Sequence, residues 1–230
     1  MCGRFARFAG RASLEELFGI PLLLPALPRF NVAPGQPALA VRRDDAGRHE
    51  FAEVQWGFNL QRADGRRSLL VNARSESAAA KPAFQDSFRR RRCLIPADGF
   101  FEWSPGPAKR PFFIHRGDHR CLALAGLWRL ERDRGGDGGP HFTILTRDAD
   151  AALQTIHDRM PVIVPREAFD TWLDGSAADA GNLLAGLPEA PLVATPVGRR
   201  VNDPGHDDPG CIVAVPDPRE ARPATRLPGI

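Results

Sequence analysis

The chain has 230 residues, 43% of them hydrophobic, so it can bury one large core, and its formal net charge of +3 neither requires nor excludes a polyanionic partner. No apolar run approaches the roughly 18 residues of a transmembrane helix, and no charged segment followed by an apolar one marks a signal peptide. The four cysteines stand far apart without a C-x-x-C pair, which gives no support for a zinc site or a disulfide framework.

The chain starts Met1-Cys2-Gly3-Arg4-Phe5, and removal of Met1 would leave Cys2 as the N-terminal residue. Its amine and thiol have reference pKa values of about 8 and 8.5, so both have usable deprotonated fractions near neutral pH. Such an aminothiol can trap an aldehyde first as an imine and then as a five-membered thiazolidine ring. From position alone, an ordinary second residue in a flexible tail is an equally open interpretation of Cys2.

Short strands and a few helices are predicted along the rest of the chain. The capping-box spacing of Ser13 and Glu16, with Gly19 as a stop, predicts a helix over residues 13–18. Two further helices are predicted over residues 148–156 and 165–173, the second with a Pro in its first turn. Apolar or alternating runs predict strands at 38–41, 54–58, 69–72, 93–97, 100–103, 112–115, 122–130, 142–146, 192–194 and 212–215.

The spacing of these elements predicts the fold class. Connections of hairpin length outnumber helical crossovers, which indicates a single α+β domain with a mostly antiparallel core. The domain is expected to span residues 1–215, followed by a loosely ordered tail over residues 216–230 that has little to bury. A dinucleotide-binding domain is disfavoured, because no G-x-G-x-x-G follows a strand, and no Walker A sequence is present.

Polar residues follow directly on the apolar run that ends at Val71. A strand end here could aim the amide of Asn72 at a substrate oxygen and the guanidinium of Arg74 at a phosphate. The alternative is a strand that simply leaves the core for solvent.

Two further residues have the setting of proton-transfer groups. Glu102 is flanked by Phe101 and Trp103, so desolvation should raise its pKa and suit it to moving protons, unless it is an exposed residue on an alternating strand. His157 follows a predicted helix beside Asp158. A lone His is more often structural, yet the immediate polar neighbours of this one favour a site.

Taken together, these segments resemble the SOS response-associated peptidase (SRAP) family, the abasic-site processing proteins. Order and spacing agree from Met1 to about Val215. The matching motifs are M-C-G-R-F at the start, N-V-A-P-G from Asn31, W-G from Trp56, N-A-R-S-E from Asn72, R-C-L-I-P-A-D-G-F-F-E-W from Arg92 and I-H-D-R-M-P from Ile156.

The resemblance implies a barrel-like β core and a protein that senses abasic sites in single-stranded DNA and crosslinks to them covalently. Cys2 would form the thiazolidine with the sugar aldehyde. Glu102 would open the sugar ring and transfer protons, Asn72 would orient the sugar and Cys2, and His157 would assist proton transfer. An AP-lyase side reaction and autocatalytic removal of Met1 are further implied activities.

The same resemblance implies the DNA contacts. Arg4, Arg74 and Arg159 would bind phosphates, and Trp103 would stack on a base, a contact worth about 1–3 kcal/mol. Three other residues are carried over as DNA contacts, namely Asn31, Pro34 and Thr146. The run from Arg89 to Arg92 is instead expected on a solvated helix face.

Some residues depart from the family pattern. The stretch Asn59 to Gly65 stands where many members carry a Pro and a further Trp, so one stacking surface is in doubt. Arg147 and Asp150 stand where Thr and Asn are frequent. None of these changes removes a group that the covalent step needs.

Two other functions compete with this interpretation. One is an N-terminal-nucleophile glutamine amidotransferase, which also matures to an N-terminal Cys but acts on an amide. The other is a single-stranded DNA-binding module without covalent chemistry. The expected protein is a cytoplasmic monomer that needs neither a metal nor another cofactor, contacts no membrane, and meets abasic single strands, including those at junctions with duplex.

Overall fold

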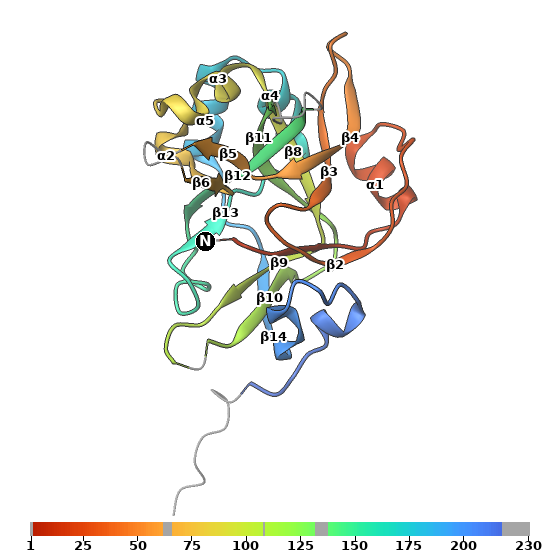
Figure 1. The fold of residues 1–230 in the computed structure, drawn as a ribbon, viewed down its shortest axis with the longest axis vertical. Coiled ribbons are helices and arrows are strands. Elements are labelled where there is room, and N and C mark those ends of the chain that lie inside the picture. The colour runs from red at the N-terminus through yellow and green to blue at the C-terminus, as the bar shows by residue number, and fades with distance from the viewer. Residues whose placement is uncertain (1, 62–65, 108, 132–137, 218–230) are drawn as a thin grey trace, which may run out of the picture.

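The computed structural model of the chain describes residues 2–61, 66–107, 109–131 and 138–217 (Figure 1). Its helices are α1 (Arg11–Phe18), α2 (Ser75–Ala78), α3 (Pro82–Arg90), α4 (Phe169–Leu173) and α5 (Ala177–Gly186), with short 3-10 turns at Arg166–Ala168, Arg199–Asn202 and Pro209–Ile212. Its strands are β1 (Phe5–Arg7), β2 (Arg29–Val32), β3 (Pro37–Arg43), β4 (His49–Trp56), β5 (Phe58–Gln61), β6 (Arg67–Leu70), β7 (Asn72–Arg74), β8 (Arg92–Ala97), β9 (Gly99–Trp103), β10 (Pro111–Arg116), β11 (Leu122–Glu131), β12 (Gly139–Asp148), β13 (Arg159–Pro161) and β14 (Leu192–Pro196).

A closed ring of strands forms the centre of the molecule. The ring runs β8-β3-β4-β12-β11, and it closes because β11 pairs with both β12 and β8. All of its pairings are antiparallel except that of β12 with β4. The strands β7 and β13 extend it, both pairing with β12. The expectation of a single α+β domain with a mostly antiparallel, barrel-like core is therefore confirmed.

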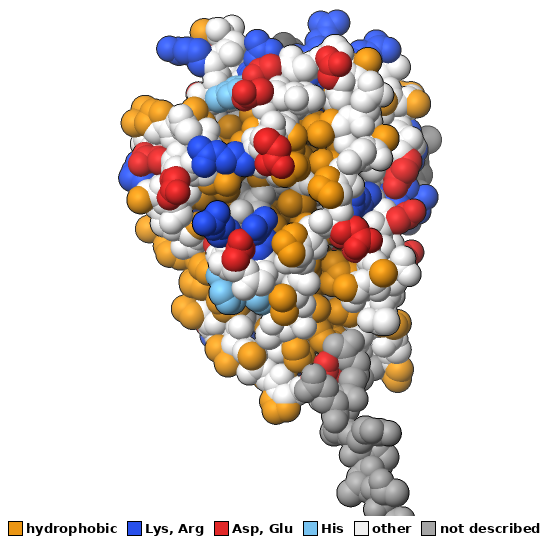
Figure 2. Space-filling view, turned by 180° about the vertical axis from the view of Figure 1, so that it is seen from behind, with side chains coloured by type: hydrophobic (Ala, Val, Ile, Leu, Met, Phe, Trp, Pro, Cys, Tyr) orange, Lys and Arg blue, Asp and Glu red, His pale blue; other side chains and the backbone are white. Residues whose placement is uncertain are grey.

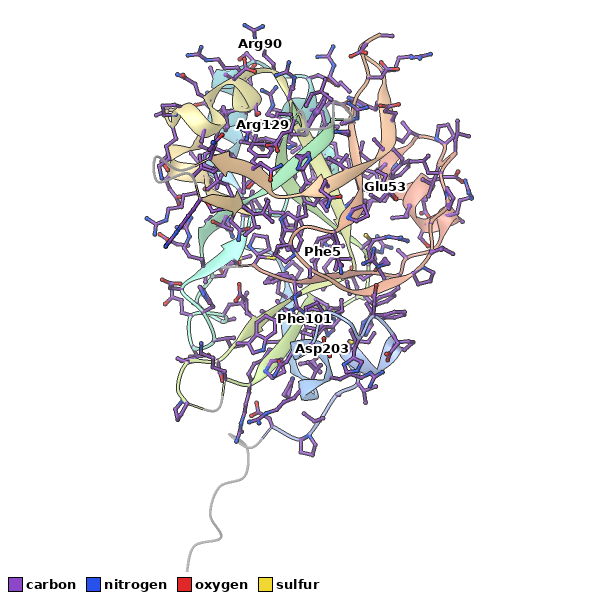
Figure 3. The ribbon with its side chains drawn as sticks, in the orientation of Figure 1. Phe5, Glu53, Arg90, Phe101, Arg129 and Asp203 are labelled. Atoms are coloured by element: carbon purple, nitrogen blue, oxygen red, sulfur yellow. The ribbon has the colours of Figure 1, made fainter. Side chains whose placement is uncertain are left out.

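A second sheet lies below the barrel in Figure 1 and contains the N-terminal strand. Its order is β14-β10-β9-β1-β2, with every pairing antiparallel. A hydrophobic core cluster between barrel and sheet includes Cys2, Phe5 and Trp56. The rings of Phe5 and Trp56 lie 5.2 Å apart, and Trp56 stacks on Phe142 at 6.0 Å. The N-terminal residues are thus anchored where the two sheets meet, and Figure 3 shows Phe5 at this central position.

Three helices, α3, α4 and α5, gather at the opposite end of the barrel (Figure 1). Trp172 of α4 is fully buried there and donates from Nε1 to the carbonyl oxygen of Cys93 at 2.9 Å. The side chain of Arg92 is also buried, and it donates to the carbonyl oxygens of Trp172, Phe88 and Gly175. The expectation that all of Arg89 to Arg92 lies on a solvated helix face is therefore wrong for Arg92, which begins β8 and holds two helices to the barrel.

The segment over residues 199–212 folds back onto β2. The Asp207 carboxylate accepts hydrogen bonds from the amides of Phe30, at 2.5 Å, and Asn31, at 2.9 Å, and pairs with the Arg29 side chain. One carboxylate therefore attaches this late part of the chain to a strand beside β1.

Most of the predicted strands are confirmed, and three helical features were misjudged. Residues 148–156 form no helix, because residue 148 ends β12 and residues 151–156 are turns. The apolar side chains of Leu153 and Ile156 have helical spacing, yet they lie in a loop and are buried against the core. Helix α1 begins at Arg11 with Gly10 as its N-cap, so Ser13 is not a cap. A capping box is present instead at Ser176 and Asp179 of α5, a helix that the sequence pattern did not predict.

Two other expectations differ from the structure, and a third falls mostly outside the described residues. The predicted helix over residues 165–173 is divided into a 3-10 turn and α4. The predicted strand over residues 212–215 is replaced by a 3-10 turn, and only Ala214 makes an isolated bridge, to Val197. Met1 and most of the predicted tail, from residue 218, lie outside the described residues. None of the helices in the described part of the chain is long and apolar enough to cross a membrane.

Candidate active site

The site forms where the N-terminal residues run beside β9. β1 pairs antiparallel with β9, and the Phe101 amide donates to the Arg4 carbonyl at 2.9 Å. This direction carries Cys2 toward Glu102. The Cys2 side chain has no exposed surface, and burial raises the pKa of its thiol, with the Glu102 carboxylate adding to the rise. The thiol is therefore held protonated and needs a base before it can act as a nucleophile.

Asn72 approaches Cys2 from the barrel side. It begins β7, which runs parallel to β12. Its Nδ2 donates to the carbonyl oxygen of Cys2 at 2.8 Å. Its Oδ1 is buried and has no hydrogen-bond partner among the residues that the structure describes. One half of this amide therefore fixes Cys2, and the other half is an acceptor available to a substrate hydroxyl or amine.

Glu102 supplies a carboxyl group with a shifted proton affinity. It lies on β9, the residue is 3% exposed, and burial raises its pKa to about 7. The sequence expectation that desolvation raises this pKa is confirmed. A carboxyl that is half protonated near neutral pH can both take and give a proton.

His157 completes the group from the loop between β12 and β13. Its Nε2 lies 3.9 Å from Oε2 of Glu102, and its Nδ1 accepts a hydrogen bond from the Arg159 amide at 2.9 Å. A backbone amide can only donate, so the neutral ring carries its proton on Nε2, facing Glu102. Burial also lowers the pKa of His157. Asp158 Oδ1 lies 2.8 Å from the same Nδ1 and would pair with the protonated ring instead.

A cleft of about 810 Å³ opens onto Glu102 and His157. Trp103 forms one wall, and its Nε1 donates to Oδ1 of Asn202 at 2.8 Å, which fixes the ring. The cleft is lined by Glu102, Trp103, Ser104, Pro105, Lys109, Gln154, Ile156, His157, Asp158 and Asn202. It offers an aromatic face, an amine and a proton-transfer pair to one ligand.

The half-buried Arg4 and the buried Asn31 form a pair beside this site. Nη1 of Arg4 donates to Oδ1 of Asn31 and to the carbonyl of Val201, both at 2.7 Å. Nδ2 of Asn31 donates to the carbonyls of Val201, Asp203 and His206. Asn31 has no exposed surface, so its expected role in lining the DNA site is replaced by an internal one: it holds Arg4 and the 199–212 segment.

Arg159 and Thr146 are also more enclosed than the sequence led us to expect. Thr146 is fully buried, and its Oγ1 donates weakly to the Ala73 carbonyl at 3.5 Å across β12 and β7. Arg159 is 9% exposed and is bound by Glu76 and Asp148. Neither residue, as placed here, presents an unoccupied donor to DNA.

Arg74 and Pro34 are better placed to meet a ligand. Arg74 ends β7, two residues after Asn72, and its side chain is exposed. Pro34 is half-buried in the turn that follows β2. On the face shown in Figure 2, basic and acidic side chains are interspersed.

Sequence reasoning missed several residues that shape the site. Asn202 fixes Trp103, and Asp207 holds the segment that contains Asn202. Lys109, one of two lysines in the chain, lines the cleft from the loop between β9 and β10. No local sequence pattern marks these residues. Two of them reach the site only because the 199–212 segment packs on β2, and Lys109 reaches it through the loop of the β9–β10 hairpin.

The described residues contain one group of side chains with the composition of a metal site. It consists of His49, Asp170 and Asp174, with one ligand atom of each within 4.8 Å of the others. Asp174 already pairs with His49 and Arg43. This group lies on β4, on α4 and at the residue that follows α4, none of which lines the cleft.

Comparison with known proteins gives a consistent family. A family model described as "SOS response associated peptidase (SRAP)" matches residues 1–204. Abasic site processing protein YoqW of Bacillus subtilis is 32% identical over 92% of this chain and 99% of its own length. Abasic site processing protein YedK of Escherichia coli is 34% identical over 88% of this chain and 95% of its own length.

The fold has a match among solved structures. A crystal structure of a protein from Bordetella bronchiseptica superposes with a TM-score of 0.73 at 26% identity. The superposition covers 86% of this chain and all of that one. Nearly the whole domain is therefore shared.

Proposed function

Because the chain belongs to the SOS response-associated peptidase (SRAP) family, we propose that it processes abasic sites in DNA by joining Cys2 covalently to the open-chain sugar. The observation that carries this proposal is the convergence of Asn72, Glu102 and His157 on Cys2. Asn72 donates a hydrogen bond to the Cys2 carbonyl, and the charge of Glu102 raises the pKa of the Cys2 thiol. His157 faces Glu102.

Ring opening comes first, because an abasic sugar is mostly a closed hemiacetal without a free aldehyde. Glu102, with a pKa of about 7, is ionised in part at neutral pH and can take the proton of the sugar hydroxyl at C1′. The ring oxygen must receive a proton as the C–O bond breaks, and the Nε2 proton of His157 faces the same region. Oδ1 of Asn72 can accept a bond from the sugar while its Nδ2 holds Cys2.

Two bonds to the same carbon then complete the crosslink. The α-amine that removal of Met1 would free attacks C1′, and loss of water gives an imine. The thiol adds across the C=N bond, so that a C–S bond forms and the nitrogen takes up a proton. The buried thiol starts protonated, and we assign the removal of its proton to Glu102, whose charge acts on the thiol pKa.

The imine opens two further routes. It acidifies the neighbouring C2′, so β-elimination of the 3′ phosphate would cleave the strand in an AP-lyase reaction. Removal of Met1, by this protein itself or by another, must precede every route, because an acylated nitrogen cannot form the imine.

The DNA partner is proposed to be single-stranded around the lesion. The cleft places Trp103 next to Glu102, where a neighbouring unpaired base can stack on the indole. Arg74 lies on the strand that carries Asn72 and can reach a flanking phosphate.

Mass spectrometry of protein lacking Met1, incubated with an abasic single strand, tests the proposal. We expect a denaturation-resistant adduct that Cys2→Ala does not form. Cys2→Ser should give an imine that borohydride traps, without a stable ring. The proposal fails if the wild-type protein gives no adduct, or if Cys2→Ala gives the same one. Ammonia release from glutamine would favour the amidotransferase alternative.

A further inference from the structure

The guanidinium of Arg159 has no terminal hydrogen left for an incoming ligand. Its Nη1 lies 2.9 Å from Oε1 of Glu76 and 2.5 Å from Oδ1 of Asp148. Its Nη2 lies 2.9 Å from Oε2 of Glu76 and 2.6 Å from the Thr146 carbonyl oxygen. The remaining donor, Nε, is buried. A phosphate can therefore reach Arg159 only by displacing one of these acceptors.

The acceptors differ in how firmly they are held. Glu76 grips both terminal nitrogens in the paired geometry that suits a guanidinium, and the Thr146 carbonyl belongs to the backbone of β12. Asp148 uses a single oxygen, and its side chain is 87% exposed. Among these, the exposed and singly bonded carboxylate is the easiest to exchange.

The charges around Arg159 oppose phosphate binding in the free protein. Two carboxylates contact the one guanidinium, so these three groups carry a net negative charge, which the nearby Arg74 offsets only through Glu76. A phosphate that replaces Asp148 leaves the number of anionic groups in contact with Arg159 unchanged. A phosphate that binds while both carboxylates stay in place would be repelled by them. Arg159 also stands at the base of the loop that presents His157, to which its own amide donates.

We propose that Asp148 is an internal competitor for DNA phosphate. It occupies Nη1 of Arg159 in the free protein, and a backbone phosphate next to the abasic site takes its place when DNA binds. Asp148 thereby sets the affinity for DNA and not the chemistry at Cys2. This inference rests on the proposed function, because it takes the phosphate to belong to DNA.

Noncovalent affinity is the direct test, measured with Cys2→Ala protein and intact single-stranded DNA by fluorescence anisotropy. Asp148→Asn and Asp148→Ala, each in this background, should both lower Kd by about fivefold at low salt. Glu53→Gln changes the net charge by the same amount on β4, beside α1 in Figure 3, and should lower Kd much less. Thermal unfolding of each variant checks that the fold is kept.

Arg159→Gln identifies the route of the effect. It should weaken binding and make the slope of log K against log salt shallower by about 0.7. Asp148→Asn added to Arg159→Gln should have no more effect than Glu53→Gln. An equal gain in that double variant, or weaker binding by Asp148→Asn alone, would overturn the inference. Failure of the wild-type protein to crosslink abasic DNA would count against the proposed function, whereas an unchanged Kd in Asp148→Asn with normal crosslinking would count against the inference alone.

Discussion

Nε2 of His157 lies 3.9 Å from Oε2 of Glu102, and burial shifts the two pKa values in opposite directions. That of Glu102 rises to about 7, and that of His157 falls. The carboxyl of Glu102 therefore holds its proton more firmly than the His157 ring does, the reverse of the ordinary order, so near neutral pH a protonated carboxyl can stand beside a neutral imidazole.

Crosslinking by the wild-type protein should therefore become faster as pH rises through about 7. The ionised form of Glu102, which takes the sugar proton, accumulates above its pKa. Glu102→Gln should lose this rise and keep only the later one that comes from the amine, whose ordinary pKa is about 8. The measurement is the rate of adduct formation on denaturing gels between pH 5.5 and 9. A step near pH 7 that persists in Glu102→Gln would contradict the assignment.

The same carboxyl should lower stability at high pH. Its pKa is about 7 when folded and about 4.3 when unfolded, so the folded state binds more protons between these values, and stability falls as pH rises through this window. The loss is on the order of 4 kcal/mol above pH 7. Glu102→Gln should then unfold at a higher temperature than wild type at pH 8 and at a similar one at pH 4.5. Calorimetry at both pH values checks this, and equal differences at the two would refute it.

Asn72→Ala should slow crosslinking by about tenfold with little change in DNA affinity. The substitution removes the bond to the Cys2 carbonyl and the buried acceptor Oδ1, and loss of one such bond is worth about 1 kcal/mol or more. Single-turnover rates at saturating DNA separate this effect from binding. Asn59→Ala, on β5, is the matched control and should react normally. A rise in Kd without a change in rate would place Asn72 in binding alone.

Asp207→Ala should release the 199–212 segment and cost about 2 kcal/mol of stability. It leaves the amides of Phe30 and Asn31 and the side chain of Arg29 without their shared acceptor. Hydrogen exchange should show faster exchange in residues 199–212 before the barrel opens. The exposed Asp45 offers a neutral comparison as Asp45→Ala. Unchanged protection of the segment would show that other contacts suffice to hold it.

Arg92→Gln should destabilise the protein by about 3 kcal/mol, whereas Arg89→Gln should change stability by less than about 0.5 kcal/mol. The buried guanidinium of Arg92 serves several carbonyl oxygens, and Arg89 lies exposed on α3. Urea denaturation of both variants gives the difference directly. Similar losses in the two would mean that the bonds of Arg92 contribute little.

The sequence predicted most of the strands and the environment of Glu102, because these depend on local patterns. Alternation and apolar runs are properties of a few neighbouring residues, and a carboxylate between aromatic residues on a strand is desolvated by them. The helix predicted over residues 148–156 is instead the end of β12 followed by turns, in which Leu153 and Ile156 are buried. Their burial comes from contact with the core around Cys2, which no short window of sequence contains.

The roles of the arginines were the least predictable part of the site. Arg4, Arg92 and Arg159 are all engaged by acceptors inside the protein, and Arg74 is exposed. A guanidinium binds a protein carboxylate or carbonyl with the same geometry as a phosphate, so the residue type cannot distinguish the two roles. Only the partners that folding brings together decide between them.

Arg4 bonds to Asn31 and to the carbonyl of Val201, a residue that is synthesised much later. The order of synthesis therefore decides when these contacts can form. Translation produces Cys2 well before the 199–212 segment. In a nascent chain, Cys2 is therefore present long before Val201, which bonds to Arg4, and Asn202, which fixes Trp103. We expect the complete site around Cys2 to assemble only after residues 199–212 have been synthesised.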